Sequence, residues 1–231
     1  MEQLVHALVR HEFELYLLMD HNQAIRILKK FPDSILFINI DEGLKEPEWE
    51  DYVRNLMSSP DTKEVRIGIL SYNEDRALAE KYLMELAVPC GFIGLKLGLM
   101  ESTQIILKTL ATNEARGRRK HVRATCKDPN QATFNVKVDN KVRDGNIVDI
   151  SAAGMACTFK EDFQPKVGTH FTDIQLRLQG KLCMVAGRVA GFHREQKNHY
   201  VFMFDPDMTD STKDKIYSCI HRTLQDYIAQ I

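Results

Sequence analysis

The chain has 231 residues, which is enough for two domains, since domains commonly hold about 100 to 150 residues. Its 44% hydrophobic and 27% charged residues are typical of globular proteins and argue against intrinsic disorder. The formal net charge is -1, but residues 1–110 contain 12 Lys and Arg against 18 Asp and Glu, and the remaining residues contain 19 against 14. An acidic half therefore precedes a basic half, and we expect an anionic partner at the second.

The five cysteines are widely spaced, and none belongs to a C-x-x-C pair. This pattern argues against a disulfide framework and against a zinc site. The first residues lack a basic segment followed by an apolar core, and no run of about 18 apolar residues occurs. We therefore expect a cytoplasmic protein with no metal, no cofactor and no membrane-inserted segment.

The first half alternates between apolar runs and segments with helical periodicity, which predicts strands joined by helices. The runs expected as strands are residues 13–19, 34–40, 65–70 and 91–95. The segments expected as helices are residues 20–31, 48–57, 75–86 and 99–115. Short strands joined by helices imply a parallel sheet with right-handed crossovers. We therefore predict an α/β domain over residues 1–111.

From residue 121 onward the pattern changes to short alternating runs separated by turn-forming residues. Examples of these runs are residues 133–138, 173–178 and 200–204. Their regular spacing predicts a closed or nearly closed β-barrel with one face of each strand in the core. Apolar residues recur every four positions in residues 211–231, at Ile216, Ile220, Leu224 and Ile228. This period predicts an amphipathic helix that packs on the barrel.

A cluster of positive charge begins the basic half. Arg119 and Arg123 stand four residues apart where the helical pattern gives way to a strand, and Arg118 directly precedes them. Arginine offers a planar, permanently charged fork of donors that matches a phosphate and the O6 and N7 edge of guanine. Two arginines at this spacing can hold one compact nucleotide that carries phosphate.

A second candidate segment, residues 148–154, ends one expected strand and begins the next. Asp149 is an acceptor suited to the N1 and N2 edge of guanine, Ser151 is a small donor, and Gly154 permits close approach or a positive φ. Either motif alone is weak, because basic runs are usually solvated linkers and D-x-S-x-x-G is a common turn. Together, in this order, they indicate a nucleotide site.

The combination of R-x-x-x-R and D-x-S-x-x-G across one hairpin resembles the PilZ family of cyclic di-GMP receptors, over about residues 112–231. The resemblance implies an antiparallel six-stranded β-barrel with a C-terminal helix. It also implies that Arg119 and Arg123 contact the guanines and phosphates of cyclic di-GMP. Asp149, Ser151 and Gly154 would close over a guanine. In that family the residue before the first arginine influences whether one ligand or an intercalated pair binds, and Arg118 favours a pair.

The resemblance further implies a receptor rather than an enzyme. The process under its control would be motility, adhesion or virulence, through an effector protein such as a flagellar motor component or a regulator. Because the arginines lie in the linker between the two domains, we expect ligand binding to order the linker and to change how the domains sit.

Residues 1–111 resemble response-regulator receiver domains in their alternation of strands and helices. A receiver uses an acidic pair that holds magnesium, a phosphoacceptor aspartate at the end of a central strand, and a lysine. The residues that could fill such positions are Asp20, Asp41, Ser71 and Lys96. However, His21 stands where a second acid is expected, and we expect four strands where receivers have five. We therefore predict a degenerate receiver-like domain that is not phosphorylated.

Two alternatives stay open. The first is a phosphorelay protein with an active receiver domain that is phosphorylated at Asp41. The second is a nucleic-acid-binding barrel that uses the basic segment, since small barrels often bind single strands. The alternation places Phe134, Phe202 and Phe204 in the core rather than on a base-stacking surface, which disfavours the second alternative.

Overall fold

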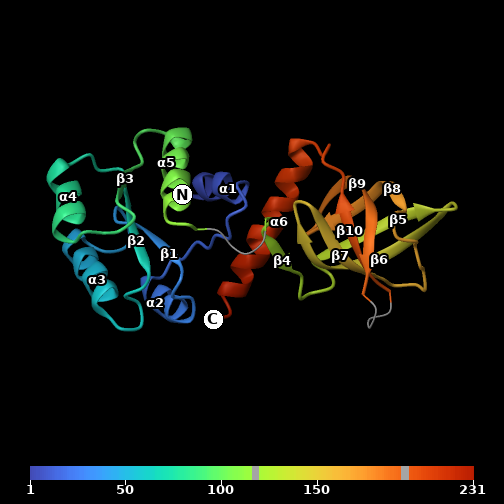
Figure 1. The fold of residues 1–231 in the computed structure, drawn as a ribbon, viewed down its shortest axis with the longest axis horizontal. Coiled ribbons are helices and arrows are strands. Elements are labelled where there is room, and N and C mark those ends of the chain that lie inside the picture. Colours follow the sequence, from blue (N-terminus) through green and yellow to red (C-terminus); the bar gives the residue numbers. More distant parts are fainter. Residues whose placement is uncertain (116–119, 194–197) are drawn as a thin grey trace. The chain divides into compact units, whose positions relative to one another are not determined.

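The computed structural model describes residues 1–115, 120–193 and 198–231 (Figure 1). The chain divides into two compact units. The first consists of Met1–Leu8, Leu17–Arg116 and Ile231, and the second of Val9–Tyr16 and Gly117–Gln230. Val9–Tyr16 thus belongs to the second unit, although the segments before and after it in the chain belong to the first. The sequence pattern does not indicate this arrangement.

The first unit is built of helices around a small parallel sheet (Figure 1). Its helices are α1 (Glu2–Val9), α2 (His21–Lys30), α3 (Glu46–Ser58), α4 (Arg76–Glu80), the π-helix η1 (Lys81–Glu85) and α5 (Leu99–Thr112). Among the residues that the structure describes, its strands are β1 (Ile35–Asn39), β2 (Arg66–Ser71) and β3 (Phe92–Gly94), in the order β1-β2-β3. Every residue of β2 after Arg66 is buried, which explains its continuous apolar run.

The prediction of a strand over residues 13–19 is wrong. This segment forms no strand, and none of its side chains is fully buried. Its N-terminal part, through Tyr16, belongs to the second unit and so does not extend the sheet of the first. The apolar composition of the run predicted burial, but a strand also requires a neighbouring strand to pair its backbone groups.

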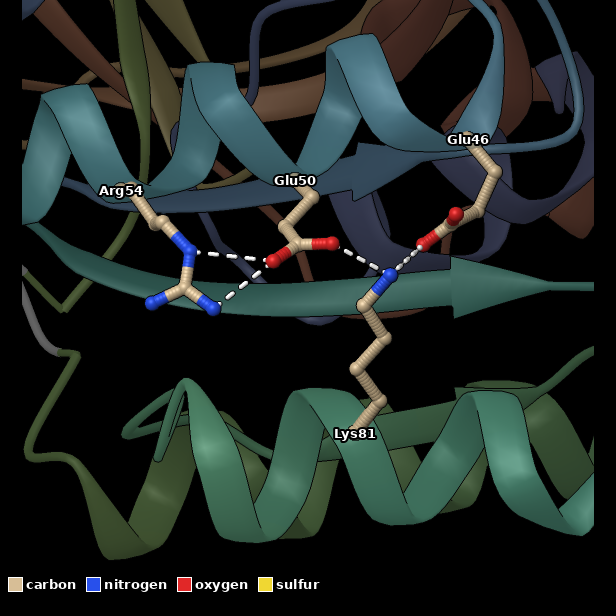
Figure 2. Close-up of polar contacts among 4 residues, drawn as sticks. All are labelled: Glu46, Glu50, Arg54 and Lys81. Carbon is tan, nitrogen blue, oxygen red and sulfur yellow. Dashed lines mark hydrogen bonds and ion pairs between the residues drawn. The ribbon is translucent and has the colours of Figure 1, made fainter.

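A network of charged side chains connects α3 to η1 (Figure 2). Lys81 Nζ lies 2.9 Å from Glu46 Oε1 and also pairs with Glu50. Arg54 donates to Glu50 Oε1 from Nε at 3.0 Å and from Nη2 at 2.7 Å. Hydrogen bonds to Glu50 and then to Glu46 raise the pKa of the Lys81 ammonium. The Lys81 ammonium thus links η1 to α3 through two carboxylates.

The second unit contains a closed antiparallel barrel of six strands with a C-terminal helix, as predicted (Figure 1). The barrel strands are β5 (Ala132–Val138), β6 (Lys141–Ser151), β7 (Gly154–Phe159), β8 (His170–Leu178), β9 (Lys181–Phe192) and β10 (His199–Phe204). They are ordered β6-β5-β8-β9-β10-β7, and pairing of β6 with β7 closes the barrel. The short strand β4 (Arg123–Thr125) pairs with the end of β6, and helix α6 (Asp210–Ile228) follows the barrel.

Aromatic rings fill the barrel core. Phe134 and Phe202 are 2% and 0% exposed, and Phe134 meets Phe159 edge to face with ring centroids 5.1 Å apart. In α6, Ile216 and Ile220 are fully buried, which confirms the amphipathic helix. No helix in the described ranges is both long and apolar enough to cross a membrane.

Candidate functional site

The two predicted motifs meet where β4 pairs with the end of β6. In this antiparallel pairing Arg123 lies opposite Ser151, and Thr125 lies opposite Asp149. The chain then turns directly from β6 into β7, so that Ser151 also lies opposite Gly154. Because neighbouring strands are about 4.8 Å apart, these residues form one small surface on three adjacent strands.

Asp149 reaches this surface because of a β-bulge. The register between β6 and β7 shifts between Ile147 and Asp149. Ile147 and Ile150 are 1% and 0% exposed, so both face the core although only two residues separate them. The bulge absorbs the extra residue and turns the Asp149 side chain away from the core.

Arg123 and Asp149 form an ion pair across β4 and β6. Arg123 Nε lies 3.5 Å from Asp149 Oδ1, and the two side chains are 43% and 21% exposed. This distance is longer than the 2.7–2.9 Å or so of a short charge-assisted hydrogen bond. The carboxylate therefore holds the guanidinium near the surface while leaving it accessible to an anion.

Ser151 and Gly154 close the turn between β6 and β7. The Ser151 hydroxyl is buried and donates to the carbonyl oxygen of Gly154 at 3.2 Å. A Cβ atom on Gly154 would lie 2.1 Å from the carbonyl oxygen of Phe202 in β10. Gly154 does not have a positive φ, so close approach of the backbones, rather than backbone conformation, requires glycine here.

The remaining arginines of the first motif, Arg118 and Arg119, lie outside the described residues. The residues after them contact the N-terminal segment of the second unit. His121 Nδ1 lies 3.0 Å from Glu12 Oε1, and the Val122 backbone N–H donates to Glu12 Oε2 at 2.9 Å. Sequence reasoning missed Glu12, because no motif or periodicity connects residues 109 positions apart.

The cysteine thiols near the site are kept protonated. Burial raises the pKa of the Cys126 thiol to about 12, with smaller contributions from Cys219 and Asp149. Burial, and then the charge of Asp149, also raises the pKa of Cys157. Since the thiolate is the nucleophilic form, neither thiol is reactive at neutral pH.

The positions compared with a receiver are only partly brought together. Asp41 accepts hydrogen bonds from the Ser71 hydroxyl and the Tyr72 backbone N–H, both at 2.6 Å. Lys96 pairs with Glu74 at 3.1 Å, and Asp20 caps α2 by accepting from Asn22 N at 2.8 Å. Within the described ranges, no group of three or more His, Cys, Asp and Glu residues could hold a metal ion.

Comparison with known families identifies the barrel. The family model for the PilZ domain matches residues 117–222. Residues 117–222 are a PilZ domain. Both motifs thus lie within the PilZ domain, and so do β4 to β10 and the start of α6.

Solved structures of PilZ proteins are similar to part of the chain. The PilZ domain of YcgR from Escherichia coli with c-di-GMP is 14% identical, with a TM-score of 0.40, over 49% of this chain and 96% of that chain. YcgR in complex with c-di-GMP from the same organism is 16% identical, with a TM-score of 0.42, over 49% of each chain. The inhibitor of motility MotI from Bacillus subtilis is 16% identical, with a TM-score of 0.37, over 47% of this chain and 52% of that chain. The chain thus covers about half of the last two proteins. No curated protein matches its sequence.

Proposed function

We propose that this chain is a receptor for cyclic di-GMP, which binds where β4 meets the turn between β6 and β7. The observation that carries the proposal is the register that places Arg123 opposite Ser151. Asp149 completes the group with its carboxylate 3.5 Å from Arg123. The two motifs, far apart in the chain, thus supply charged donors and an acceptor to one surface of a PilZ domain.

Each side chain has a role that follows from its chemistry. Arg123, together with Arg119, binds phosphate oxygens and the O6 and N7 edge of guanine through its forked donors. Asp149 accepts from the N1 and N2 edge of a guanine. Ser151 closes the turn through its hydrogen bond to Gly154, and the missing side chain of Gly154 lets the turn lie close to the backbone of β10. Arg118 adds a further guanidinium and favours an intercalated pair of ligands.

Recognition of guanine by Asp149 can be tested with a related ligand. In cyclic di-AMP the adenine N1 is an acceptor, which would face the carboxylate oxygens without a proton between them. We expect cyclic di-AMP to bind at least about a hundredfold more weakly, since leaving a partly buried group without its hydrogen-bond partner costs about 1–3 kcal/mol, and more for a charged group. Competition against labelled cyclic di-GMP measures this ratio, and equal affinities would contradict the role of Asp149.

The proposed output is a change in the relation between the domains. The arginines before β4 lie where the chain passes from the first unit to the second. A ligand that binds these arginines restricts the conformation of the linker. Ordering of a segment by a ligand is one of the common kinds of conformational switch. We propose that residues 1–111 and 112–231 act as the two domains of this switch, and that a motor or regulatory protein detects the change.

A further inference from the structure

Residues 9–16, here called the N-terminal strap, are fixed to the C-terminal helix of the second unit. Arg10 lies 3.2 Å from Asp210 and 3.1 Å from Asp214, in the first turns of α6. Farther along α6, the Tyr217 hydroxyl donates to Glu12 Oε1 at 2.8 Å. The strap is thus held at two points, and its direction along the helix is defined.

Glu12 connects the strap to the segment that carries the binding arginines. Its two carboxylate oxygens receive the Tyr217 hydroxyl, the Val122 backbone N–H and the His121 ring nitrogen. A carboxylate only accepts hydrogen bonds, so His121 donates to Glu12 in the form that carries a proton on Nδ1. The Glu12 side chain is 20% exposed, and partial burial strengthens these charge-assisted bonds.

The backbone at Glu12 is also held in an uncommon conformation. Its φ is +66°, in the left-handed region that non-glycine residues seldom occupy. Such a conformation persists where surrounding contacts determine it. The hydrogen bond from the Glu12 backbone N–H to the Val9 carbonyl oxygen, at 3.0 Å, and the three hydrogen bonds of the carboxylate supply those contacts.

Val122 transmits this constraint to the nucleotide site. It is buried, and it directly precedes Arg123, the first residue of β4. A fixed Val122 N–H sets where β4 begins, and the register then places Arg123 opposite Ser151. We propose that Glu12 is a positioning residue for the nucleotide site, which anchors the backbone before β4 so that Arg123 faces Asp149 and Ser151. This inference rests on the function proposed above.

Because Glu12 accepts three hydrogen bonds, we expect the affinity for cyclic di-GMP to fall in steps as its acceptor atoms are removed. An ionised carboxylate accepts all three donors, whereas the amide of Glu12→Gln has a single acceptor oxygen. Burial, and then the hydrogen bond to Glu12, raises the pKa of the Tyr217 hydroxyl, so the hydroxyl keeps its proton and donates to Glu12 even at alkaline pH. The exposed Glu14 lies two residues away in the same strap and hydrogen-bonds Tyr16, so Glu14→Ala is a matched control for charge.

Calorimetry with cyclic di-GMP on the full chain tests the proposal. We expect Glu12→Ala to bind at least about tenfold more weakly, as for the loss of a charged hydrogen bond, Glu12→Gln to be intermediate, and Glu14→Ala to stay within about twofold of the native chain. Affinity of Glu12→Ala within twofold of native, or tighter binding, would overturn the proposal. If Glu12→Ala does not fold, the same titration is made with Tyr217→Phe, which removes one of the three hydrogen bonds to Glu12. An affinity for cyclic di-GMP reduced by less than about threefold in this variant counts against the proposal.

Hydrogen exchange distinguishes positioning from a general loss of stability. We expect the Val122 amide to exchange faster in Glu12→Ala, while amides of β8 and β9 keep their protection. Equal acceleration across the barrel would show a merely structural role and overturn the proposal. Failure of the native chain to bind cyclic di-GMP would instead refute the proposed function, so the two failures are distinguishable.

Discussion

Gly154 serves the barrel as well as the candidate site. A Cβ atom there would lie 2.1 Å from the Phe202 carbonyl oxygen, and backbone atoms of β10 cannot move aside without disturbing the barrel. We expect Gly154→Ala to lower the free energy of unfolding by about 1–3 kcal/mol, the usual cost of overpacking. Urea denaturation measures this. Gly191→Ala is the control, because no atom lies within 4 Å of the corresponding Cβ and its φ is not positive. Equal stabilities of the two variants would contradict this account of Gly154.

The buried thiols predict how stability depends on pH. Burial raises the pKa of Cys126 to about 12 and that of Cys219 to about 11, from 9.0. Above pH 9 the unfolded chain releases these protons while the folded chain keeps them, so the free energy of unfolding falls as pH rises. Urea denaturation between pH 8 and about 11 measures this slope, and we expect Cys126→Ala to reduce it. A slope unchanged by the substitution would contradict the assignment to Cys126.

At the level of single residues, the sequence indicated which side chains to examine but only part of what they do. The donor and acceptor chemistry of Arg123 and Asp149 follows from residue type alone. The 3.5 Å pairing of these two side chains depends on the bulge at Asp149, and a bulge has no reliable pattern in the sequence. The packing role of Gly154 depends on β10, which is distant in the chain.

Among the secondary-structure elements, helix α6 has the clearest relation between sequence and structure. Its apolar residues recur every four positions, and Ile220 is fully buried whereas Leu224 is only half-buried. We expect Ile220→Ala to lower the free energy of unfolding by about 2–5 kcal/mol, and Leu224→Ala to lower it by less. Thermal or urea denaturation of both variants tests this, and a larger effect at Leu224 would contradict the packing.

The periodicity of apolar residues predicted the barrel strands and the helices better than it predicted the run at residues 13–19. In β5 and β10 apolar and polar residues alternate because one face of each strand is buried. These strands can form because every strand of a closed barrel has a partner on each side. In residues 13–19 the same composition is present without a pairing strand. Local pattern cannot show which segments pair, because pairing depends on the rest of the chain.

On the scale of the whole molecule, the division into an α/β unit and a barrel was predictable from the change of period near residue 121. The assignment of Val9–Tyr16 to the barrel unit was not, because the residues that this segment contacts, such as His121 and Asp210, are more than 100 positions away in the chain. The chain therefore passes between the units at both ends of the strap as well as at the linker.

The position of the arginines in the linker leads to a prediction about how the ligand affects the full chain in solution. Because the arginines proposed to bind the ligand lie close to the point in the sequence where one unit ends and the other begins, we expect saturating cyclic di-GMP to change the small-angle scattering profile of the full chain. Arg123→Ala is the control, at a ligand concentration that saturates the native chain but lies well below the dissociation constant of the variant, and it should give the profile of the chain without ligand. An unchanged profile of the native chain at saturation would contradict the coupling between binding and domain arrangement.

The most direct test of the central claim is isothermal titration of the native chain and of Arg123→Ala with cyclic di-GMP. Of the two arginines in the first motif, Arg123 is the one that lies within the described residues, and its guanidinium pairs with Asp149 on the candidate surface. We predict binding by the native chain at micromolar ligand, and affinity at least about thirtyfold weaker in Arg123→Ala, since charged hydrogen bonds contribute about 1.5–3 kcal/mol each. No heat of binding with the native chain, or equal affinity in the variant, would contradict the account.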